Sequence, residues 1–187
     1  MSETAGEPRI TQVRFGGVGG QGMVLAGRLL GKAASLFDEK DAVVTQSYGP
    51  EARGGASRAD VVVSEGTVDY PFVIKADVLA VFFQEAYVMF RPRLKDDGLL
   101  LIDSKLVKPS PDEQAFRSVP ATDIAEQLGT RMAANVVMLG YLVGATDVVS
   151  RESVEQAIRT TVKQRIIDLN IEALGAGIRL AREHAAA

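Results

Sequence analysis

The chain has 187 residues, 47% of them hydrophobic and 24% charged, and its 21 basic and 24 acidic side chains leave a net charge of −3. This length suits one α/β domain with a full core, and the basic residues form no runs that would predict a nucleic-acid partner. With no cysteine and one histidine, His184, the sequence excludes disulfides and thiol nucleophiles and argues against iron–sulfur clusters and zinc sites, whose ligands are mainly Cys and His.

The N-terminal residues 1–9 are polar and acidic, so we expect a disordered or extended segment before a single domain over 10–184. That segment contains no apolar signal region. The longest apolar stretch, Val136–Val149, is shorter than the roughly 20 residues that span a bilayer. These features predict a cytoplasmic protein that does not enter a membrane.

The first half of the chain alternates strand-like and helix-like patterns. Ile10–Phe15 is rich in β-branched residues and predicts a strand, and Met23–Phe37 has apolar residues at helical spacing. Two further apolar runs, Ala42–Gln46 and Ala59–Ser64, predict strands on either side of a long loop.

The second half continues with buried strands separated by helices and ends in helices. Predicted strands are Asp77–Phe83, Leu99–Asp103 after a turn at Asp96–Gly98, and Phe116–Pro120; predicted helices are Gln84–Leu94, Thr122–Leu128, Arg131–Ala145, Arg151–Ile167 after an N-cap at Ser150, and Asp168–Glu183. His184 falls in a solvated tail in this scheme. The fold class that follows is α/β, with a doubly wound, mostly parallel, Rossmann-like sheet and C-terminal helices.

The first glycine cluster lies between a predicted strand and a predicted helix. It contains G-x-G-x-x-G at Gly17, Gly19 and Gly22, which is the context of a dinucleotide-binding turn. The acid that should bind the ribose at the end of the second strand is missing, because that strand ends in Thr45-Gln46-Ser47. A glycine turn kept for packing or for an anion is therefore favoured over NAD(P) binding. Its candidate binding residues are Gly17, Gly19, Gly20, Gln21 and Gly22.

The loop Ser47–Ser57 is longer than a plain connection requires. It holds three glycines, Pro50, and the oppositely charged Glu51 and Arg53, so it can be shaped as a binding surface. An ordinary glycine-rich surface loop is the alternative.

No catalytic residue stands out. One histidine near the end of the chain makes a Ser/His pair implausible, and no carboxylate spacing singles out an acid/base pair. The Gly-Asp-Gly segment typical of thiamine diphosphate sites does not occur. The sequence thus predicts a nucleotide-type fold without its own catalytic chemistry and with no metal site.

Two motifs together resemble the γ subunit of the 2-oxoacid:ferredoxin (acceptor) oxidoreductases, whose members act on 2-oxoglutarate, pyruvate, ketoisovalerate, indolepyruvate or arylglyoxylate. They are Gly-Gly-Val-Gly-Gly-Gln-Gly at 16–22 and Gln-Ser-Tyr-Gly-Pro-Glu-Ala-Arg-Gly-Gly-Ala-Ser at 46–57. Supporting segments are Val-Asp-Tyr-Pro at 68–71, Ala-Asp-Val-Leu at 76–79, Asp-Asp-Gly at 96–98, Leu-Leu-Ile-Asp at 100–103 and Ala-Asn-Val-Val-Met-Leu-Gly at 134–140. The resemblance covers about residues 10–180.

This resemblance implies a subunit of a complex that oxidatively decarboxylates a 2-oxoacid to an acyl-CoA. Thiamine diphosphate, Mg²⁺, iron–sulfur clusters and coenzyme A would lie on or between partner α, β and δ-type ferredoxin-like subunits, and ferredoxin or another acceptor would take the electrons. This chain would hold none of these cofactors alone.

The resemblance also suggests a place for the second motif, at the junction with the α and β chains. The residues expected at that interface or active-site loop are Gln46, Ser47, Tyr48, Gly49, Pro50, Glu51, Arg53, Gly54 and Gly55. Arg53 would contact a partner or a coenzyme A phosphate, unless Glu51 and Arg53 only pair within the loop. A stand-alone dinucleotide-dependent oxidoreductase and a purely structural scaffold are the rival interpretations.

Overall fold

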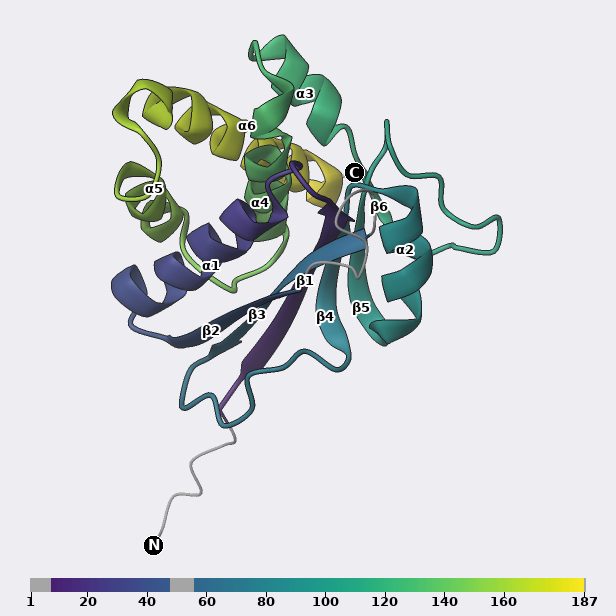
Figure 1. Ribbon diagram of the computed structural model, residues 1–187, viewed down its shortest axis with the longest axis horizontal. Coiled ribbons are helices and arrows are strands. Elements are labelled where there is room, and N and C mark those ends of the chain that lie inside the picture. The colour runs from purple at the N-terminus through teal and green to yellow at the C-terminus, as the bar shows by residue number, and fades with distance from the viewer. Residues whose placement is uncertain (1–7, 48–55, 187) are drawn as a thin grey trace, which may run out of the picture.

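The computed structural model describes residues 8–47 and 56–186. Within these residues the chain forms one six-stranded sheet in the order β2-β3-β1-β4-β5-β6 (Figure 1). The strands are β1 (Ile10–Val18), β2 (Asp41–Ser47), β3 (Ala56–Ser64), β4 (Ala76–Val81), β5 (Leu94–Asp103) and β6 (Arg117–Val119). The helices are α1 (Met23–Phe37), α2 (Gln84–Phe90), α3 (Ala121–Gln127), α4 (Ala134–Ala145), α5 (Arg151–Arg159) and α6 (Ile167–Ala186).

The sheet is mixed and mostly parallel, which confirms the predicted α/β class. β1 pairs in parallel with β4, β4 with β5, and β5 with β6. β3 is antiparallel both to β1 and to β2, so β2 runs in the same direction as β1 although β3 separates them. The carboxyl ends of β1, β2, β4, β5 and β6 therefore lie at one edge of the sheet.

Helices cover both faces of the sheet, and each face has its own apolar layer. Val13 and Phe15 of β1 point into the larger layer, which α1, α4, α5 and α6 close. Leu79 and Leu100 point into the smaller layer, which α2 closes through Phe90. Figure 1 shows α1, α4, α5 and α6 on one side of the sheet and α2 on the other. This two-sided cover explains the continuously apolar runs 61–63 in β3, 78–81 in β4 and 99–102 in β5.

Helices α4 and α6 pack closely against each other at glycine positions. A Cβ atom added at Gly140 would lie 2.2 Å from the carbonyl oxygen of Leu174, and one at Gly177 would lie 2.0 Å from that of Val137. Almost every residue of α4 is buried. The C-terminal helices therefore line the larger core layer. The sequence predicts the helices but not their close backbone contact.

Several predicted boundaries are wrong for identifiable reasons. The helix predicted over Gln84–Leu94 ends at Phe90, and a 3-10 turn over Arg91–Arg93 containing Pro92 leads into β5. Asp96–Gly98, predicted as a turn, lies inside β5, where the register with β4 shifts between the pairs Ala76↔Leu94 and Val78↔Leu99.

The C-terminal helices also differ from the prediction. Ser150 is an N-cap as expected, since its Oγ accepts a hydrogen bond from the Ser153 amide, but α5 ends at Arg159 rather than Ile167. α6 then continues to Ala186, so His184 lies on a helix and not in a free tail. Its Nδ1 is 2.8 Å from the hydroxyl oxygen of Tyr141.

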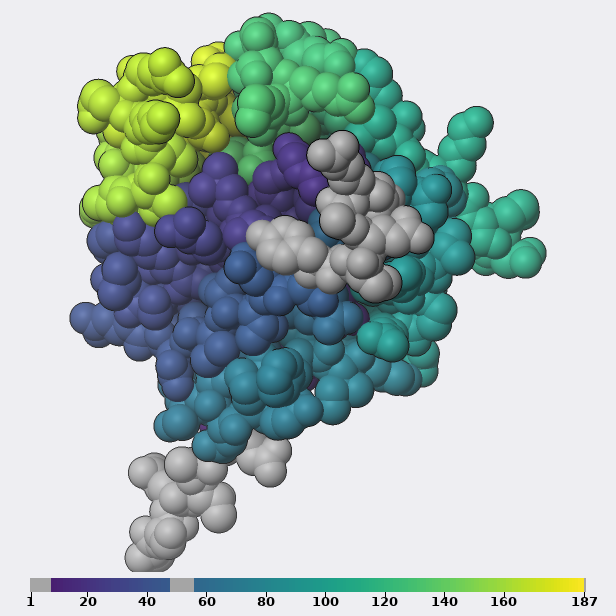
Figure 2. Space-filling model, viewed as in Figure 1, coloured from purple at the N-terminus to yellow at the C-terminus, as the bar shows by residue number. Residues whose placement is uncertain are grey.

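The segment between β5 and β6 is the most protruding part of the described chain (Figure 2, teal-green at the right). It is nevertheless held by α2. The side-chain amide of Gln84 both donates to the carbonyl of Lys108 and accepts from its amide, at 3.0 and 2.8 Å. The Tyr87 hydroxyl accepts from the Ser110 amide at 3.0 Å. Arg91 forms an ion pair with Glu113, and this contact lowers the pKa of Glu113.

Candidate functional site

The glycine cluster and the described flanks of the Ser47–Ser57 loop meet at the carboxyl edge of the sheet. β1 runs through Gly16 and Gly17 to Val18, further than the predicted end at Phe15. In the ladder, Gly17 is opposite Ser57 and Val18 is opposite Ala56, the first residue of β3. The Ser57 hydroxyl donates a hydrogen bond to the Gly17 carbonyl at 3.4 Å. The described flanks of the Ser47–Ser57 loop therefore lie beside the glycine turn.

The glycines of the turn serve different physical purposes. A Cβ at Gly17, which is extended, would lie 2.5 Å from Oε1 of Gln21 and 2.6 Å from the sulfur of Met23. Gly20 and Gly22 have φ values of +92° and +79°, which favour glycine. A Cβ added at Gly19 would meet no atom within 4 Å. The residues with positive φ in this turn are thus Gly20 and Gly22, while Gly17 belongs to β1.

Gln21 braces the turn. Its Oε1 accepts from the Val18 amide at 2.8 Å, and its Nε2 donates to the carbonyl of Phe82 at 2.8 Å, just beyond the end of β4. These two bonds fasten the β1–α1 turn to the neighbouring parallel strand. Its side chain therefore positions the turn through both ends of its amide.

Asn135 fixes the other side of the same turn, and the sequence patterns do not single it out. It is 1% exposed, and its Nδ2 donates to the Gly22 carbonyl at 2.9 Å. A Cβ at Gly22 would lie 2.4 Å from that nitrogen. The signal that could have identified it is the Ala-Asn-Val-Val-Met-Leu-Gly segment at 134–140, which enters the sequence argument only as part of a resemblance.

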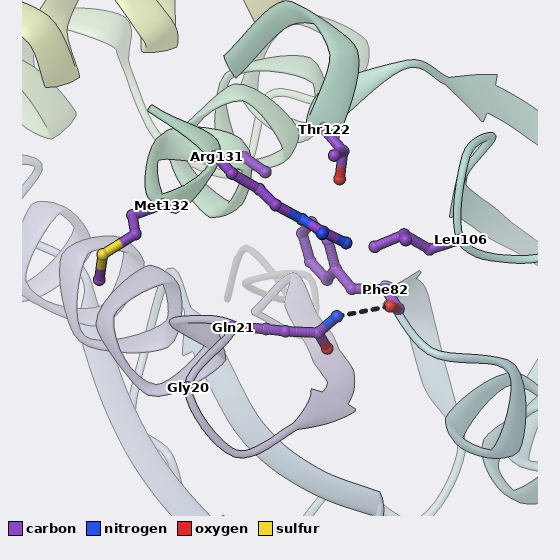
Figure 3. Close-up of a pocket in the computed structure, with 8 residues that line it drawn as sticks. Gly20, Gln21, Phe82, Leu106, Thr122, Arg131 and Met132 are labelled. Atoms are coloured by element: carbon purple, nitrogen blue, oxygen red, sulfur yellow. Dashed lines mark hydrogen bonds between the residues drawn. The ribbon is translucent and has the colours of Figure 1, made fainter. Parts of the chain in front are cut away.

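A pocket of about 140 Å³ opens beside the turn (Figure 3). Its lining comes from segments that follow the carboxyl ends of β1, β4 and β5 and from the start of the helices beyond them: Gly20, Gln21, Phe82, Leu106, Thr122, Arg131, Met132 and Ala134. Ligands of open α/β sheets bind in this position. The volume is below the roughly 300–1,000 Å³ of sites that enclose a drug-sized ligand. It suits one group of a ligand rather than a whole dinucleotide.

Arg131 is the cationic side chain of this pocket. It stands in the 3-10 turn Arg131–Ala133 that precedes α4, and Figure 3 shows it extending across the pocket past Phe82 toward Leu106. Within the described chain it forms no ion pair of the kind that neutralises Arg14 or Arg91. α1 begins at the same place, so its N-terminal amides add positive potential. The pocket is therefore suited to an anionic group.

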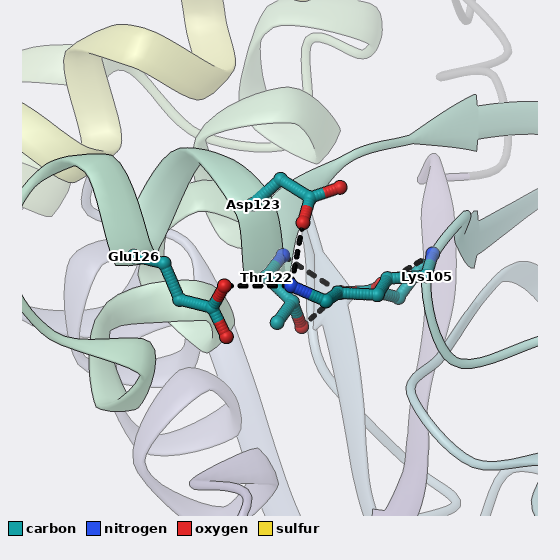
Figure 4. A network of polar contacts seen from close by, with 5 residues as sticks. Lys105, Thr122, Asp123 and Glu126 are labelled. Atoms are coloured by element: carbon teal, nitrogen blue, oxygen red, sulfur yellow. Dashed lines mark hydrogen bonds and ion pairs between the residues drawn. The ribbon is translucent and has the colours of Figure 1, made fainter.

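A polar network holds the opposite wall (Figure 4). Asp103, fully buried at the end of β5, accepts from the amide and the hydroxyl of Thr122 at 2.9 and 2.7 Å. Lys105 pairs with Asp123 at 2.7 Å and with Glu126 at 2.6 Å. These two hydrogen-bonded carboxylates raise the pKa of Lys105. Its charge is matched locally, which leaves Arg131 as the cation that faces the pocket.

The expected interface loop is only partly described. Gln46 and Ser47 end β2 as exposed residues, with Ser47 paired to Arg58 of β3. Tyr48, Gly49, Pro50, Glu51, Arg53, Gly54 and Gly55 lie outside the described residues. Their predicted role therefore stays a prediction, although both ends of the loop lie at the carboxyl edge of the sheet.

Residues 8–47 and 56–186 lack two other kinds of feature. They contain no group of three His, Asp or Glu side chains that could hold a metal ion. No helix among them is long and apolar enough to cross a membrane.

The geometry also bears on dinucleotide binding. In a dinucleotide-binding domain the second strand lies next to the first and supplies the ribose-binding acid from its end. Here the antiparallel β3 takes that place, and β2 is displaced by one strand, two spacings or about 10 Å from β1. Its last residues carry no acid. The molecule is therefore an α/β protein with a glycine turn like that of dinucleotide-binding domains. The strand that would bind the ribose beside this turn is replaced by the antiparallel β3.

Comparison with known proteins agrees with this class. The sequence signature described as pyruvate ferredoxin/flavodoxin oxidoreductase matches residues 12–180. The chain is 44% identical over 177 residues to the 2-oxoglutarate synthase subunit KorC of Methanocaldococcus jannaschii, covering 92% of this chain and 94% of that protein. The solved γ subunit of a keto/oxoacid ferredoxin oxidoreductase from Geobacter sulfurreducens superposes with a TM-score of 0.83 at 39% identity, covering 92% of this chain and 99% of that one.

A third relative has a different chain organisation. The ketoisovalerate oxidoreductase subunit VorA of Methanothermobacter thermautotrophicus is 38% identical over 177 residues, which are 92% of this chain but 37% of that protein. The chain belongs to the pyruvate ferredoxin/flavodoxin oxidoreductase family. Its resemblance to γ subunits of multisubunit 2-oxoacid oxidoreductases is confirmed.

Proposed function

We propose that this chain is the γ-type subunit of a 2-oxoacid:ferredoxin oxidoreductase that converts a 2-oxoacid and coenzyme A into an acyl-CoA and CO₂, passing two electrons to ferredoxin or another acceptor. Relatives of about the same length are subunits named for 2-oxoglutarate synthases and keto/oxoacid ferredoxin oxidoreductases. The chain has no cysteine for iron–sulfur clusters and no Gly-Asp-Gly segment for thiamine diphosphate. Those cofactors and Mg²⁺ are assigned to partner α, β and δ-type subunits.

Within that complex, the chain supplies an anion site for coenzyme A and stabilises the assembly. The observation that carries this proposal is Arg131, extended across a pocket at the carboxyl edge of the sheet beside the N-terminus of α1. Coenzyme A carries phosphate groups, and a guanidinium binds phosphate through charge-assisted hydrogen bonds. The pocket volume fits one such group, with the rest of the coenzyme lying toward a partner.

The glycine turn and the Ser47–Ser57 loop complete this surface in our proposal. Gly20 lines the pocket, and backbone amides of such a glycine turn can bind an anion. Gly17 and Gln21 shape the turn, as their contacts with Met23 and Phe82 indicate. Arg53 is proposed as a second cation on the same side, because Ser47 and Ala56 place both ends of its loop at this edge.

Substitution of Arg131 in the assembled enzyme tests the proposal. We expect Arg131→Ala to raise the KM for coenzyme A about tenfold or more, the loss of one charge-assisted phosphate contact, with kcat at saturation much less affected. Arg131→Lys should recover part of the loss, and Arg53→Ala should act in the same direction. 3′-Dephospho-coenzyme A shows whether the 3′-phosphate is the group bound, since the Arg131→Ala effect would then largely disappear with it.

The matched control is Arg165→Ala, which removes an exposed arginine from the distant 3-10 turn Gln164–Ile166. It should leave the KM for coenzyme A unchanged. An unchanged KM in Arg131→Ala, with subunits still assembled, would reject the anion site. If alanine at both Arg53 and Arg131 also left turnover intact, the scaffold interpretation would be preferred.

A further inference from the structure

The connection between β3 and β4, residues 65–75, is an irregular strap that exposes several large apolar side chains. Three large side chains on it are more than half exposed: Tyr70 at 56%, Phe72 at 55% and Ile74 at 66%. Val73, between the last two, is 6% exposed and packs into the core layer under α2. Phe72 and Ile74 flank the buried Val73 and are both exposed, so they lie on the outer side of the strap, away from the core. The Tyr70 and Phe72 rings are in edge contact, with centroids 5.6 Å apart.

The strap is fixed to the sheet by hydrogen bonds from two strands. The Val68 amide donates to Oδ2 of Asp41 at 2.8 Å. Nη2 of Arg14 donates to the Val73 carbonyl at 2.7 Å. These bonds hold the apolar side chains in one place before any partner arrives, which reduces the entropy lost on binding.

Arg14 is an unusual anchor because it is 1% exposed in the middle of β1. Its Nε and Nη2 donate to the Asp60 carboxylate at 2.7 and 2.8 Å, and its guanidinium lies 5.3 Å from the centre of the Phe90 ring. Burying a charged pair is expensive, and apolar residues of the same volume are often as stabilising. We therefore interpret the Arg14–Asp60 pair as positioning the strap, because Arg14 also donates to the Val73 carbonyl.

In the described chain the side chains of Tyr70, Phe72 and Ile74 remain exposed to solvent. Exposed aromatic side chains clustered on a rigid segment are typical of the centre of a protein interface. Tyr70 also belongs to the Val-Asp-Tyr-Pro segment at 68–71, which the proposed coenzyme site does not use. α2, whose Phe90 packs into the same core layer as Val73, exposes two more apolar residues, Val88 and Met89, at 64% and 56%.

The form of the relatives indicates what kind of partner covers this surface. In the ketoisovalerate relative the counterpart of this chain is 37% of a longer polypeptide, whereas the 2-oxoglutarate relative is a separate chain of about the same length as this one. A module that is fused in one enzyme and separate in another must recognise the neighbouring module itself when the covalent link is missing. In the ketoisovalerate relative that neighbour belongs to the part of the polypeptide outside the 37% that matches this chain.

We propose that the strap surface, formed by Tyr70, Phe72 and Ile74, is the docking site for a different subunit of the same oxidoreductase complex. The partner contributes an apolar pocket that receives the Phe72 and Tyr70 rings. Arg14 is a positioning residue that presents the strap. This inference uses the proposed function only in taking the chain to be a subunit, and it does not depend on where coenzyme A binds.

The test uses the tagged chain co-expressed with the other subunits of its enzyme. Ile74→Asp and Phe72→Asp each place a charge in the contact, and we expect the amount of partner subunits recovered with the tag to fall at least tenfold. Leu36→Asp is the matched control: Leu36 is 63% exposed on α1, which covers the opposite face of the sheet. It should leave the recovery of partner subunits unchanged.

Circular dichroism and thermal unfolding of the isolated variants verify that the strap substitutions leave the fold intact. Full assembly with both Ile74→Asp and Phe72→Asp would overturn the proposal. So would a homodimer of the isolated chain that only the strap variants dissociate in sedimentation, because the occupant would then be a second copy. This test measures subunit association, whereas the coenzyme A site is tested by the KM for coenzyme A. The two proposals can therefore fail independently of each other.

Discussion

Gly19 and Gly22 belong to the same glycine motif, but their surroundings impose different demands. Gly22 combines a positive φ with the close approach of Asn135, whereas a Cβ added at Gly19 would meet no atom within 4 Å. The motif by itself treats both as equal members of a phosphate-binding turn. At the residue scale the structure shows that Gly22 is required by sterics, whereas Gly19 has space for a side chain.

Gly22→Ala should therefore destabilise the chain by about 1–3 kcal/mol, since alanine must adopt a left-handed conformation and displace the Asn135 amide. Gly19→Ala should change the free energy of unfolding by no more than about 0.5 kcal/mol. Urea unfolding of the two variants measures the difference. Equal stability would show that the turn relaxes around Gly22 without cost.

Other important residues could not be read from the sequence. Arg131 lies far from the glycine motif along the chain and has no pattern around it, and it reaches the pocket only because α4 starts next to the β1–α1 turn. Asn135 is visible in the sequence only as part of a family-like segment. Gln21, in contrast, is identified in the sequence as a member of the glycine motif. Its side-chain amide bonds to Val18 and Phe82 and so holds the turn against β4.

At the scale of elements, both predicted ends of α1 are correct, because its amphipathic pattern is bounded by glycines and by an acidic break. For β1, β5 and α5, one predicted end is correct and the other is wrong. β1 continues through Gly16 and Gly17 because β3 supplies ladder partners there, and β5 begins early because β4 pairs with Leu94. Strand ends of this kind depend on a neighbour that is distant in sequence, so local propensity cannot locate them.

The α4–α6 pair offers a sharp test of element packing. Gly177→Ala would bring a methyl group 2.0 Å from the Val137 carbonyl oxygen and 2.6 Å from the Tyr141 amide nitrogen. We expect a loss of about 3 kcal/mol or more, because backbone atoms must separate along both helices.

Gly175→Ala is the control in the same helix, since its Cβ would meet only the end of the flexible Arg179 side chain at 3.4 Å. Alanine should be neutral there or stabilise the helix by up to about 1 kcal/mol. Thermal melts of both variants report the effect. A similar loss at the two positions would mean that helix burial, and not the contact with α4, sets the cost.

For the whole molecule, the order of strands decides which ligand the glycine turn can serve. The motif and its position between a strand and a helix are those of a dinucleotide site, but β3 occupies the place of the strand that would read the ribose. The carboxyl edge instead gathers the turn, Arg131 and the two ends of the Ser47–Ser57 loop. This arrangement favours a site shared with a partner over one enclosed by a single chain.

We therefore expect the isolated chain to bind neither NADH nor NADPH. Titration followed by nucleotide fluorescence should give no saturable signal, because the ribose-binding acid is missing and the pocket is too small for a dinucleotide. Saturable binding at a 1:1 ratio, abolished by Arg131→Ala, would instead support the stand-alone oxidoreductase.

The sequence alone determined the α/β class, most of the elements and the family resemblance, because periodicity, residue type and motif spacing are local properties. Only the tertiary structure decided that β3 separates β1 from β2, that Arg131 and Asn135 join the glycine turn, and that Arg14 holds the strap from inside the core. Each of these depends on contacts between segments far apart in the chain. Their energies come from pairing and burial, which no local pattern encodes.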